Sequence, residues 1–278
     1  MKFELDAFTP VSKKDQKLIK NTINYNSSKF IQNVERYVLF TESEPQKIKN
    51  TVVLTRDDFP FTREYVQKKL NFHPRSGWVY QQLVKFYFAK DISKKDYILV
   101  LDADVFFTKE ISFFEENKPI FTLGNHLHVE YFNHMRRMLP TLHRVKKNEC
   151  GIAHHMVINK KIINNMISLI EKENNKKFYD VFLEAINFEE SESPCSEYEI
   201  YFNFVQIYFP EYYKKRKLEW KNVPVIKKSY IENNDMISLP HYENTRPINL
   251  ITNIAKFNLR HVYMTLINSY FLWKIGKD

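Results

Sequence analysis

The chain has 278 residues, of which 44% are hydrophobic and 15% aromatic, so its composition is that of a globular protein rather than a disordered one. Its four glycines and two cysteines exclude the glycine-rich dinucleotide fingerprint, the phosphate-binding P-loop and a cysteine-rich zinc site. The net charge of +9 favours anionic partners, but no zinc finger or RNA-binding motif accompanies the basic residues. We therefore expect no nucleic-acid partner, and we expect a reducing compartment.

Strand and helix patterns alternate along the first hundred residues. The patterns predict strands over 3–8, 37–40, 51–55 and 97–101, and helices over 12–24 and 78–90. This alternation is typical of an α/β fold, a Rossmann-type, mostly parallel sheet flanked by helices. The rest of the chain predicts a strand-like stretch over 150–158 and helices over 160–172, 178–187 and 196–209.

No linker rich in proline, glycine or serine divides the chain. We predict one domain over 1–245, with a nucleotide-binding half (1–105) and an acceptor half (106–245), followed by a helical C-terminal appendage over 246–278. The sequence has no secretory signal and no run of about 18 apolar residues, so we expect a cytoplasmic protein. The basic, aromatic stretch 251–275 is either a helix packed on the domain or a peripheral contact with the inner face of an anionic membrane.

The most informative stretch is an apolar strand that ends in two carboxylates, Asp102 and Asp104. Residues i and i+2 of an extended segment project to the same side, and ligands of open α/β sheets bind at the carboxyl ends of the strands. Two hard oxygen ligands suit Mn²⁺ or Mg²⁺, which would hold a diphosphate. The alternative is an Asp-rich turn that ends a strand. Three apolar residues follow directly, without a turn residue, and this favours the metal site.

The helix predicted before this strand carries a polar face of four residues. A step of 100° per residue places together Trp78, Gln81, Gln82 and Lys85. An aromatic ring, two amides and an ammonium group suit a sugar diphosphate, through stacking, hydroxyl recognition and charge. The alternative is an ordinary solvated face with a half-buried tryptophan.

The stretch S-E-Y-E over 196–199 has a structural and a functional interpretation. As structure it is a capping box, in which Ser196 is the N-cap and Glu199 reaches back to the Ser196 N–H. A competing register begins the helix at Pro194. As function, an acid at a helix start could be the general base of an inverting transferase. Because the box occupies Glu199, Glu197 is the stronger catalytic candidate and Glu199 the second.

Histidines supply further candidate metal ligands. His241 follows the last predicted elements of the α/β domain, and neutral imidazole suits Mn²⁺, so His241 is a candidate third ligand beside Asp102 and Asp104. A plain loop histidine is the alternative. The pairs His126/His128 and His154/His155 are weaker candidates, because a lone histidine is more often structural or exposed.

Two enzyme classes use an apolar strand followed by D-x-D. A phosphatase of the haloacid-dehalogenase type would use the first aspartate as nucleophile, but it needs a later acidic pair for Mg²⁺. After Asp104 only three aspartates remain, and no Asp-Asp or G-D-x-x-x-D pattern occurs among them. About a hundred residues of α/β pattern also precede the motif, whereas the phosphatase motif opens its domain. A non-catalytic nucleotide- or glycan-binding protein with the same fold is the remaining alternative.

The motifs G-W-x-x-Q-Q-x-x-K (77–85), L-D-A-D (101–104) and S-E-Y-E-x-Y (196–201) occur in this order. The arrangement resembles a poorly characterised family of GT-A-like glycosyltransferases from bacteria and large viruses, often associated with surface-glycan synthesis. The opening stretch, with Thr9 and Asp15, is similar to that family's first strand and turn. The resemblance covers about residues 3–245. It implies a GT-A-like fold, a nucleotide-sugar donor near Thr9 and Asp15, a divalent metal, and a glycan or glycoconjugate acceptor.

Overall fold

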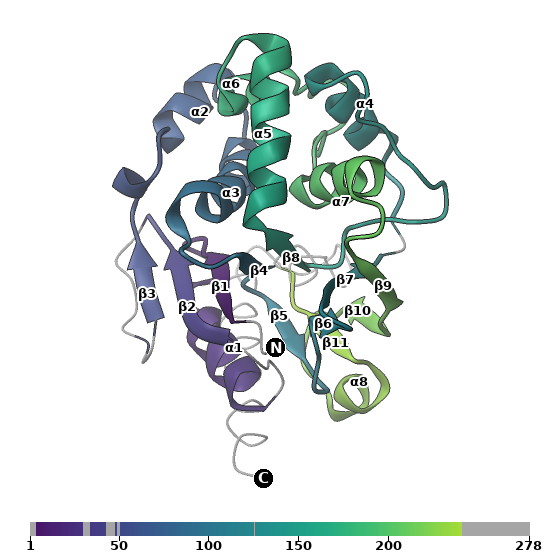
Figure 1. Cartoon of the computed structure of the whole chain (residues 1–278). Helices are drawn as coiled ribbons and strands as arrows, with labels where there is room; N and C mark the ends of the chain where they lie inside the picture. Colours follow the sequence, from purple (N-terminus) through teal and green to yellow (C-terminus); the bar gives the residue numbers. More distant parts are fainter. Residues whose placement is uncertain (1–3, 30–33, 43–47, 49–50, 125, 241–278) are drawn as a thin grey trace, which may run out of the picture.

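A five-stranded sheet forms the centre of the protein, in the order β3-β2-β1-β4-β8 (Figure 1). The structure is a computed structural model that describes residues 4–29, 34–42, 48, 51–124 and 126–240. β1–β4 run parallel, and β8 pairs antiparallel with β4. The predicted α/β class with a mostly parallel sheet is confirmed. The strands are β1 (Leu5–Pro10), β2 (Val34–Phe40), β3 (Thr51–Leu54), β4 (Tyr97–Leu101) and β8 (His155–Asn159).

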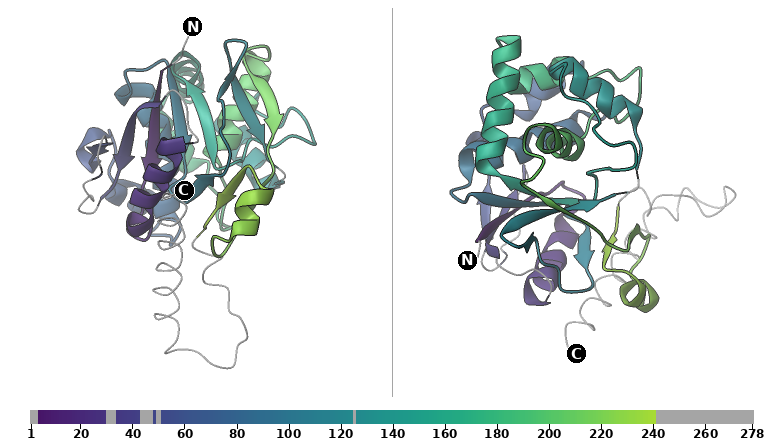
Figure 2. Two further views of the ribbon diagram at one scale, coloured as in Figure 1. Left: turned by 90° about the horizontal axis from the view of Figure 1, so that it is seen from below. Right: turned by 45° about the vertical axis from the view of Figure 1, so that its right-hand side comes forward.

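Helices cover both faces of this sheet, because its strands alternate two apolar faces. Phe8 is in register with Val38 and Val100, and these three residues belong to one core cluster. Its neighbour Ala7 belongs to the cluster on the opposite face. Figures 1 and 2 show α5, α6 and α7 on one side of the sheet and α1 and α8 on the other. The helices are α1 (Gln16–Lys29), α2 (Arg63–Lys69), α3 (Ser76–Tyr87), α4 (Val129–Met138), α5 (Lys160–Asn174), α6 (Phe178–Glu184), α7 (Glu197–Tyr208) and α8 (Lys228–Asn233).

Local sequence explains where the longest of these helices begins and ends. The side chain of Asn159 accepts hydrogen bonds from the N–H groups of Lys161 and Ile162, which caps the start of α5. Asn175 ends the helix with a left-handed backbone, φ 51°, a conformation that asparagine tolerates. Between these ends, one face of isoleucines and a methionine is buried in the core. The predicted helix over 160–172 is thus confirmed with its cause.

Two small sheets extend the domain beyond the predicted elements. One joins β10 (Trp220–Asn222), β11 (Met236–Ser238) and β5 (Val105–Phe107). The other joins β6 (Phe114–Glu115), β7 (Lys118–Leu123) and β9 (Lys214–Lys217). β9 is the densest basic run of the chain, and it lies at the edge of its sheet. Its lysines pair with acids, since Lys214 lies 2.7 Å from Glu116 and Lys215 lies 2.5 Å from Glu149.

Several predicted boundaries shift in the structure. The first strand ends at Pro10 rather than Phe8, and α1 begins at Gln16 because residues 12–15 form a turn in which Ser12 binds Asp15. The division into two halves stays a prediction, although β8 of the second half completes the sheet of the first. The appendage over 246–278 and its stretch 251–275 lie outside the described residues. Among the helices of the described part, none has the length and apolar character needed to cross a membrane.

A buried ion pair joins the central strands at their amino-terminal edge. Asp6 in β1 is fully buried and accepts two hydrogen bonds from Arg36 in β2, at 2.7 and 2.8 Å. Ser93, just before β4, donates a third at 2.6 Å. Burial by itself would raise the pKa of Asp6, but the bonds from Arg36 and Ser93 outweigh it and hold that pKa below its usual range.

We expect Asp6→Asn to lower the free energy of unfolding by about 2–4 kcal/mol at neutral pH, because an amide cannot accept all three hydrogen bonds. The folded pKa of Asp6 is depressed, so its contribution is complete above the unfolded pKa of about 3.9 and disappears as pH falls through the folded pKa. Urea unfolding from neutral to acidic pH measures the difference. Glu4→Gln is the control, since its pair with Lys95 is exposed to solvent and should contribute little to stability. Equal stability of both variants would contradict the assignment.

Candidate functional site

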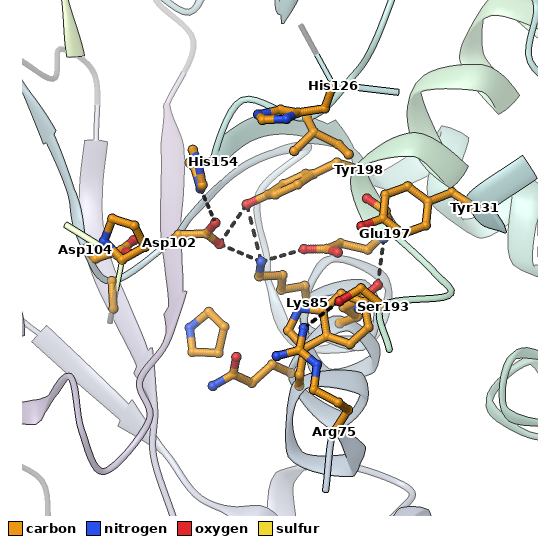
Figure 3. A pocket seen from close by; sticks show the side chains of 18 of the residues that line it. Arg75, Lys85, Asp102, Asp104, His126, Tyr131, His154, Ser193, Glu197 and Tyr198 are labelled. Carbon is orange, nitrogen blue, oxygen red and sulfur yellow. Dashed lines mark hydrogen bonds and ion pairs between the residues drawn. The ribbon is translucent and has the colours of Figure 1, made fainter. Parts of the chain in front are cut away.

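A cavity of about 460 Å³ lies at the carboxyl ends of β1 and β4 (Figure 3). From β1 the chain proceeds through β2 and β3 on one side, whereas β4 pairs on the other side of β1. Ligands of α/β sheets bind at such a switch point. Eight residues singled out from the sequence line this cavity: Asp15, Trp78, Gln81, Gln82, Lys85, Asp102, Asp104 and Glu197.

Asp102 is the first residue after β4 and receives three polar contacts. Lys85 Nζ lies 2.7 Å from its Oδ1, and the Tyr198 hydroxyl donates to the same oxygen at 3.0 Å. His154 Nδ1 lies 3.2 Å from Oδ2. Burial would raise the pKa of Asp102, but the charges of Lys85 and His154 and their hydrogen bonds hold it far below its usual range. Because an ionised carboxylate only accepts, His154 must carry its proton on Nδ1.

Asp104 lines the same cavity, as the i, i+2 spacing predicts, but it has different surroundings. Residues 103 and 104 form a turn between β4 and β5. The expectation that no turn follows the strand was therefore wrong, because Val105–Phe107 starts a new strand after that turn. No ion pair of the described residues includes Asp104. Burial, with smaller effects from the charges of Asp102 and Asp15, raises the pKa of Asp104 to about 6, against the opposing effect of His154.

Lys85 joins Asp102 to the second acid of the cavity. Its Nζ lies 2.5 Å from Glu197 Oε1 and 3.3 Å from the Tyr198 hydroxyl, and only 7% of either charged side chain, Lys85 or Glu197, is exposed. Desolvation opposes the charge of Lys85, but Asp102 and Glu197 raise its pKa well above the usual value. An ammonium group has three N–H donors, and these three contacts use all of them. Lys85 thus holds two carboxylates inside the protein.

The start of α7 carries the predicted cap, but only half of the predicted box. Ser196 is the N-cap and accepts from the N–H of Glu199 at 3.4 Å, which excludes the register that begins at Pro194. Glu199 does not reach back to Ser196. Its Oε1 accepts from the Gly151 N–H at 3.0 Å, and its Oε2 accepts from Asn203 Nδ2 at 2.8 Å.

Two predicted site residues, Glu199 and Thr9, are not brought to the cavity. Glu199 is 1% exposed and lies behind the cavity wall, where its bonds hold the segment around Gly151. Thr9 is buried in β1 and does not line the cavity, although the next residue, Pro10, does. His241 lies outside the described residues. We therefore leave Glu199 and Thr9 out of the proposed site, because both side chains are buried and neither lines the cavity.

Gln82 has a structural role that the sequence did not reveal. Its Oε1 accepts from the N–H of Glu197 at 2.9 Å, so a side chain of α3 binds the first residue of α7. This contact fixes Glu197, the first residue of α7, opposite Lys85. Lys85 lies four residues after Gln81 in α3. Trp78 and Gln81 remain on the cavity side of α3, while Val79 and Leu83 are fully buried on the other side. The predicted division of this helix into two faces is confirmed.

Of two further residues that contact Asp102, Tyr198 received no site role from the sequence and His154 only a weak one, as a candidate metal ligand. Tyr198 belongs to the S-E-Y-E motif, whose tyrosine sits between the two acids and could have been considered. His154 has a positive φ of 59°, which is uncommon for a residue with a side chain and cannot be read from sequence. Its Nε2 is buried and has no hydrogen-bond partner among the described residues. Both side chains reach Asp102 because the turn before β8 and the start of α7 meet at the carboxyl end of β4.

The fold and this cavity define an α/β protein with a polar binding site at the carboxyl edge of a parallel sheet. Over residues 12–243 the chain matches the family of unknown function DUF6492, and it belongs to that family. No curated protein matches it. Among solved structures, it is similar to the galactosyltransferase LgtC, crystallised with donor and acceptor sugar analogs, with a TM-score of 0.47 and 9% identity over 94% of this chain and 96% of that chain. We transfer neither residues nor activity from that likeness.

Proposed function

We propose that this chain is a metal-dependent glycosyltransferase, which transfers a sugar from a nucleotide-sugar donor to a glycan or related acceptor. One observation carries the proposal. One cavity at the carboxyl edge of the sheet is lined by the carboxylates of Asp102, Asp104 and the buried Glu197, and Lys85 bridges Asp102 and Glu197. Sugar transfer from a nucleotide needs a cation for the diphosphate, a surface for the donor and a base for the acceptor hydroxyl, and this cavity has a candidate for each.

The two aspartates fit a divalent cation. No ion pair of the described residues includes Asp104, and burial with the nearby charges of Asp102 and Asp15 raises its pKa in spite of His154. Asp102 accepts three contacts, and a carboxylate has about four lone-pair sites, so it retains capacity. The described part of the chain brings no three His, Cys, Asp or Glu side chains together as a complete site. Asp102 and Asp104 would thus hold the ion with substrate oxygens, and Mn²⁺ or Mg²⁺ would neutralise the diphosphate.

The donor would lie along α3. Trp78 offers a ring for stacking, and Gln81 an amide for hydroxyl groups. Asp15 lines the cavity near the end of β1, where the motif resemblance places the donor. The role expected of Lys85 changes, because all three of its N–H donors are engaged. We propose that Lys85 positions Asp102 and Glu197, rather than binding phosphate directly.

Glu197 is the proposed general base if the reaction inverts the anomeric centre. It lines the cavity, and its Oε1 lies 2.5 Å from Lys85 Nζ. The first-turn position in α7 and the bond from its N–H to Gln82 fix the backbone of Glu197. No observation in the described residues favours the phosphatase alternative, which needs further acidic ligands.

Turnover distinguishes the proposed transferase from a binding protein and from a phosphatase. The full chain is incubated with a panel of nucleotide sugars, with and without Mn²⁺, and the products are analysed by mass spectrometry. A transferase releases a nucleoside diphosphate in the presence of metal and passes the sugar to water or to an added glycan. Release of inorganic phosphate from sugar phosphates would indicate a phosphatase. Binding of UDP without any turnover of its sugars would indicate a binding protein.

A further inference from the structure

Arg75 is a cation of the cavity wall that borders Trp78 and has no assigned role in the proposed donor site. Arg75 precedes α3, and its guanidinium lies over the Trp78 ring at 4.5 Å. Its Nη2 donates to Ser193 Oγ at 2.8 Å, and its Nε donates to the Glu192 carbonyl at 3.3 Å. These contacts fix the plane of the guanidinium at the wall of the cavity, which Arg75, Trp78 and Ser193 all line.

The charge of Arg75 is uncompensated. Both of its hydrogen-bond acceptors are neutral, and no ion pair of the described residues includes it. Glu197, another residue that lines the cavity, is bound to Lys85. A guanidinium has five N–H donors, and two of its nitrogens donate to the protein here, which leaves Nη1 available. Arg75 is therefore a preorganised fork for a carboxylate or phosphate group.

A row of rings forms the wall across the cavity from Arg75. His126 and His128 have their ring centroids 6.1 Å apart, and His128 continues to Tyr131 at 4.7 Å. At the other end, His126 contacts the Trp220 ring at 5.7 Å. Figure 3 shows His126 and Arg75 on opposite sides of the pocket. A sugar ring between these walls would have aromatic faces for stacking and one cation for an anionic substituent.

Arg75 and Tyr131 lie at the end of the cavity away from Asp104. Figure 3 shows Asp104 on one side and Tyr131 on the other, with Lys85 between them. Arg75 and Lys85 are ten residues apart, so their Cα atoms are separated by about 15 Å along the axis of α3. A diphosphate held near Asp104 would therefore leave Arg75 for another group.

We infer that Arg75 and the ring wall of His126, His128 and Tyr131 form an acceptor subsite for an anionic sugar, one that carries a carboxylate or a phosphate group. The assignment of this subsite to the acceptor rests on the proposed function. The subsite itself rests on the uncompensated Arg75 facing the rings. It predicts that the enzyme extends or decorates an acidic glycan rather than a neutral one.

The test compares three probes that differ only at C6: methyl glucoside, methyl glucuronide and methyl glucoside 6-phosphate. Binding to the full chain is measured by saturation-transfer NMR titration, with UDP and Mn²⁺ present and absent. Both charged probes, or one of them, should bind more tightly than the neutral glucoside, and the tighter one identifies the oxyanion. Arg75→Gln should weaken the charged probe by about 10- to 100-fold and leave the glucoside unchanged.

Two further variants keep the result interpretable. Arg75→Lys retains the charge but not the fork, and it should give an intermediate loss. Arg56→Gln removes an equal charge from an exposed position outside the cavity, and it should change nothing. Equal binding of all three probes, binding of none in the millimolar range, or equal losses in Arg75→Gln and Arg56→Gln would overturn the subsite. So would an Arg75→Gln variant that loses UDP affinity but not glucuronide affinity.

The same titrations separate this inference from the proposed function. If UDP with Mn²⁺ does not bind the wild-type chain, the proposed function fails, whereas the comparison of charged and neutral probes still decides whether Arg75 binds an oxyanion. If UDP binds and the probes show no preference for charge, the donor site stands and the acidic acceptor is rejected.

Discussion

Replacing Lys85 with methionine is expected to lower the free energy of unfolding by about 3–5 kcal/mol, because it leaves the buried carboxylate of Glu197 without its countercharge and Asp102 with His154 alone. Lys85 contacts Asp102 at 2.7 Å and Glu197 at 2.5 Å, and its side chain is 7% exposed. Denaturant unfolding at neutral pH measures the loss.

Lys90→Met is the matched control for this variant. Lys90 lies five residues further along the same helical segment, and its pair with Asp91 is partly exposed, so the expected loss is within about 1 kcal/mol. The double variant Lys85→Met/Glu197→Gln should recover part of the lost stability, because one unpaired charge is removed with the lysine. Equal stability of the Lys85 and Lys90 variants would show that Lys85 does not hold the two acids together.

Glu197→Gln is expected to reduce the turnover number by roughly 100-fold or more, because an amide cannot accept the proton of an acceptor hydroxyl. Its Oε1 can still accept a hydrogen bond from Lys85, so the affinity for UDP should change little. Steady-state kinetics and UDP titration, with the donor identified from the nucleotide-sugar panel, measure the two quantities separately.

Glu199→Gln, two residues away, is the control for Glu197. The new side-chain NH₂ group would face Asn203 Nδ2, a donor that already bonds to the Glu199 backbone carbonyl, so two donors would meet. We therefore expect a lower melting temperature with a nearly unchanged turnover number. The reverse pattern, with turnover lost in Glu199→Gln and retained in Glu197→Gln, would exchange the roles assigned to the two acids.

Local patterns predicted the elements that carry most of this site. The strand over 97–101 has the predicted bounds, and the helices over 78–90 and 196–209 differ by a few residues only. Apolar runs and helical periodicity are local signals, and the carboxyl end of a parallel strand has a known position in the sheet. These three segments place Asp102, Lys85 and Glu197, so the sequence could indicate them as a set.

Contacts between distant segments could not be predicted in the same way. Gln82 was expected on the donor side, but its side-chain amide oxygen accepts from the first N–H of α7. This contact depends on how α3 and α7 cross. His154 directly precedes β8 and has a positive φ, and β8 runs antiparallel beside β4. Only this arrangement brings His154 to Asp102. The basic strand β9 was missed because four consecutive charged residues show no alternation, and only its pairing with β7 makes it a strand.

The most direct test of the proposed function is an isothermal titration of UDP into the full chain, with and without Mn²⁺. We predict binding that requires Mn²⁺ in the wild-type chain and is at least about 100-fold weaker in Asp104→Asn, because that carboxylate is a proposed metal ligand with no protein partner to replace. Asp91→Asn, which changes a partly exposed aspartate outside the cavity, should bind as the wild type does. UDP binding that is independent of Mn²⁺, or equally tight in Asp104→Asn with an unchanged melting temperature, would contradict the account.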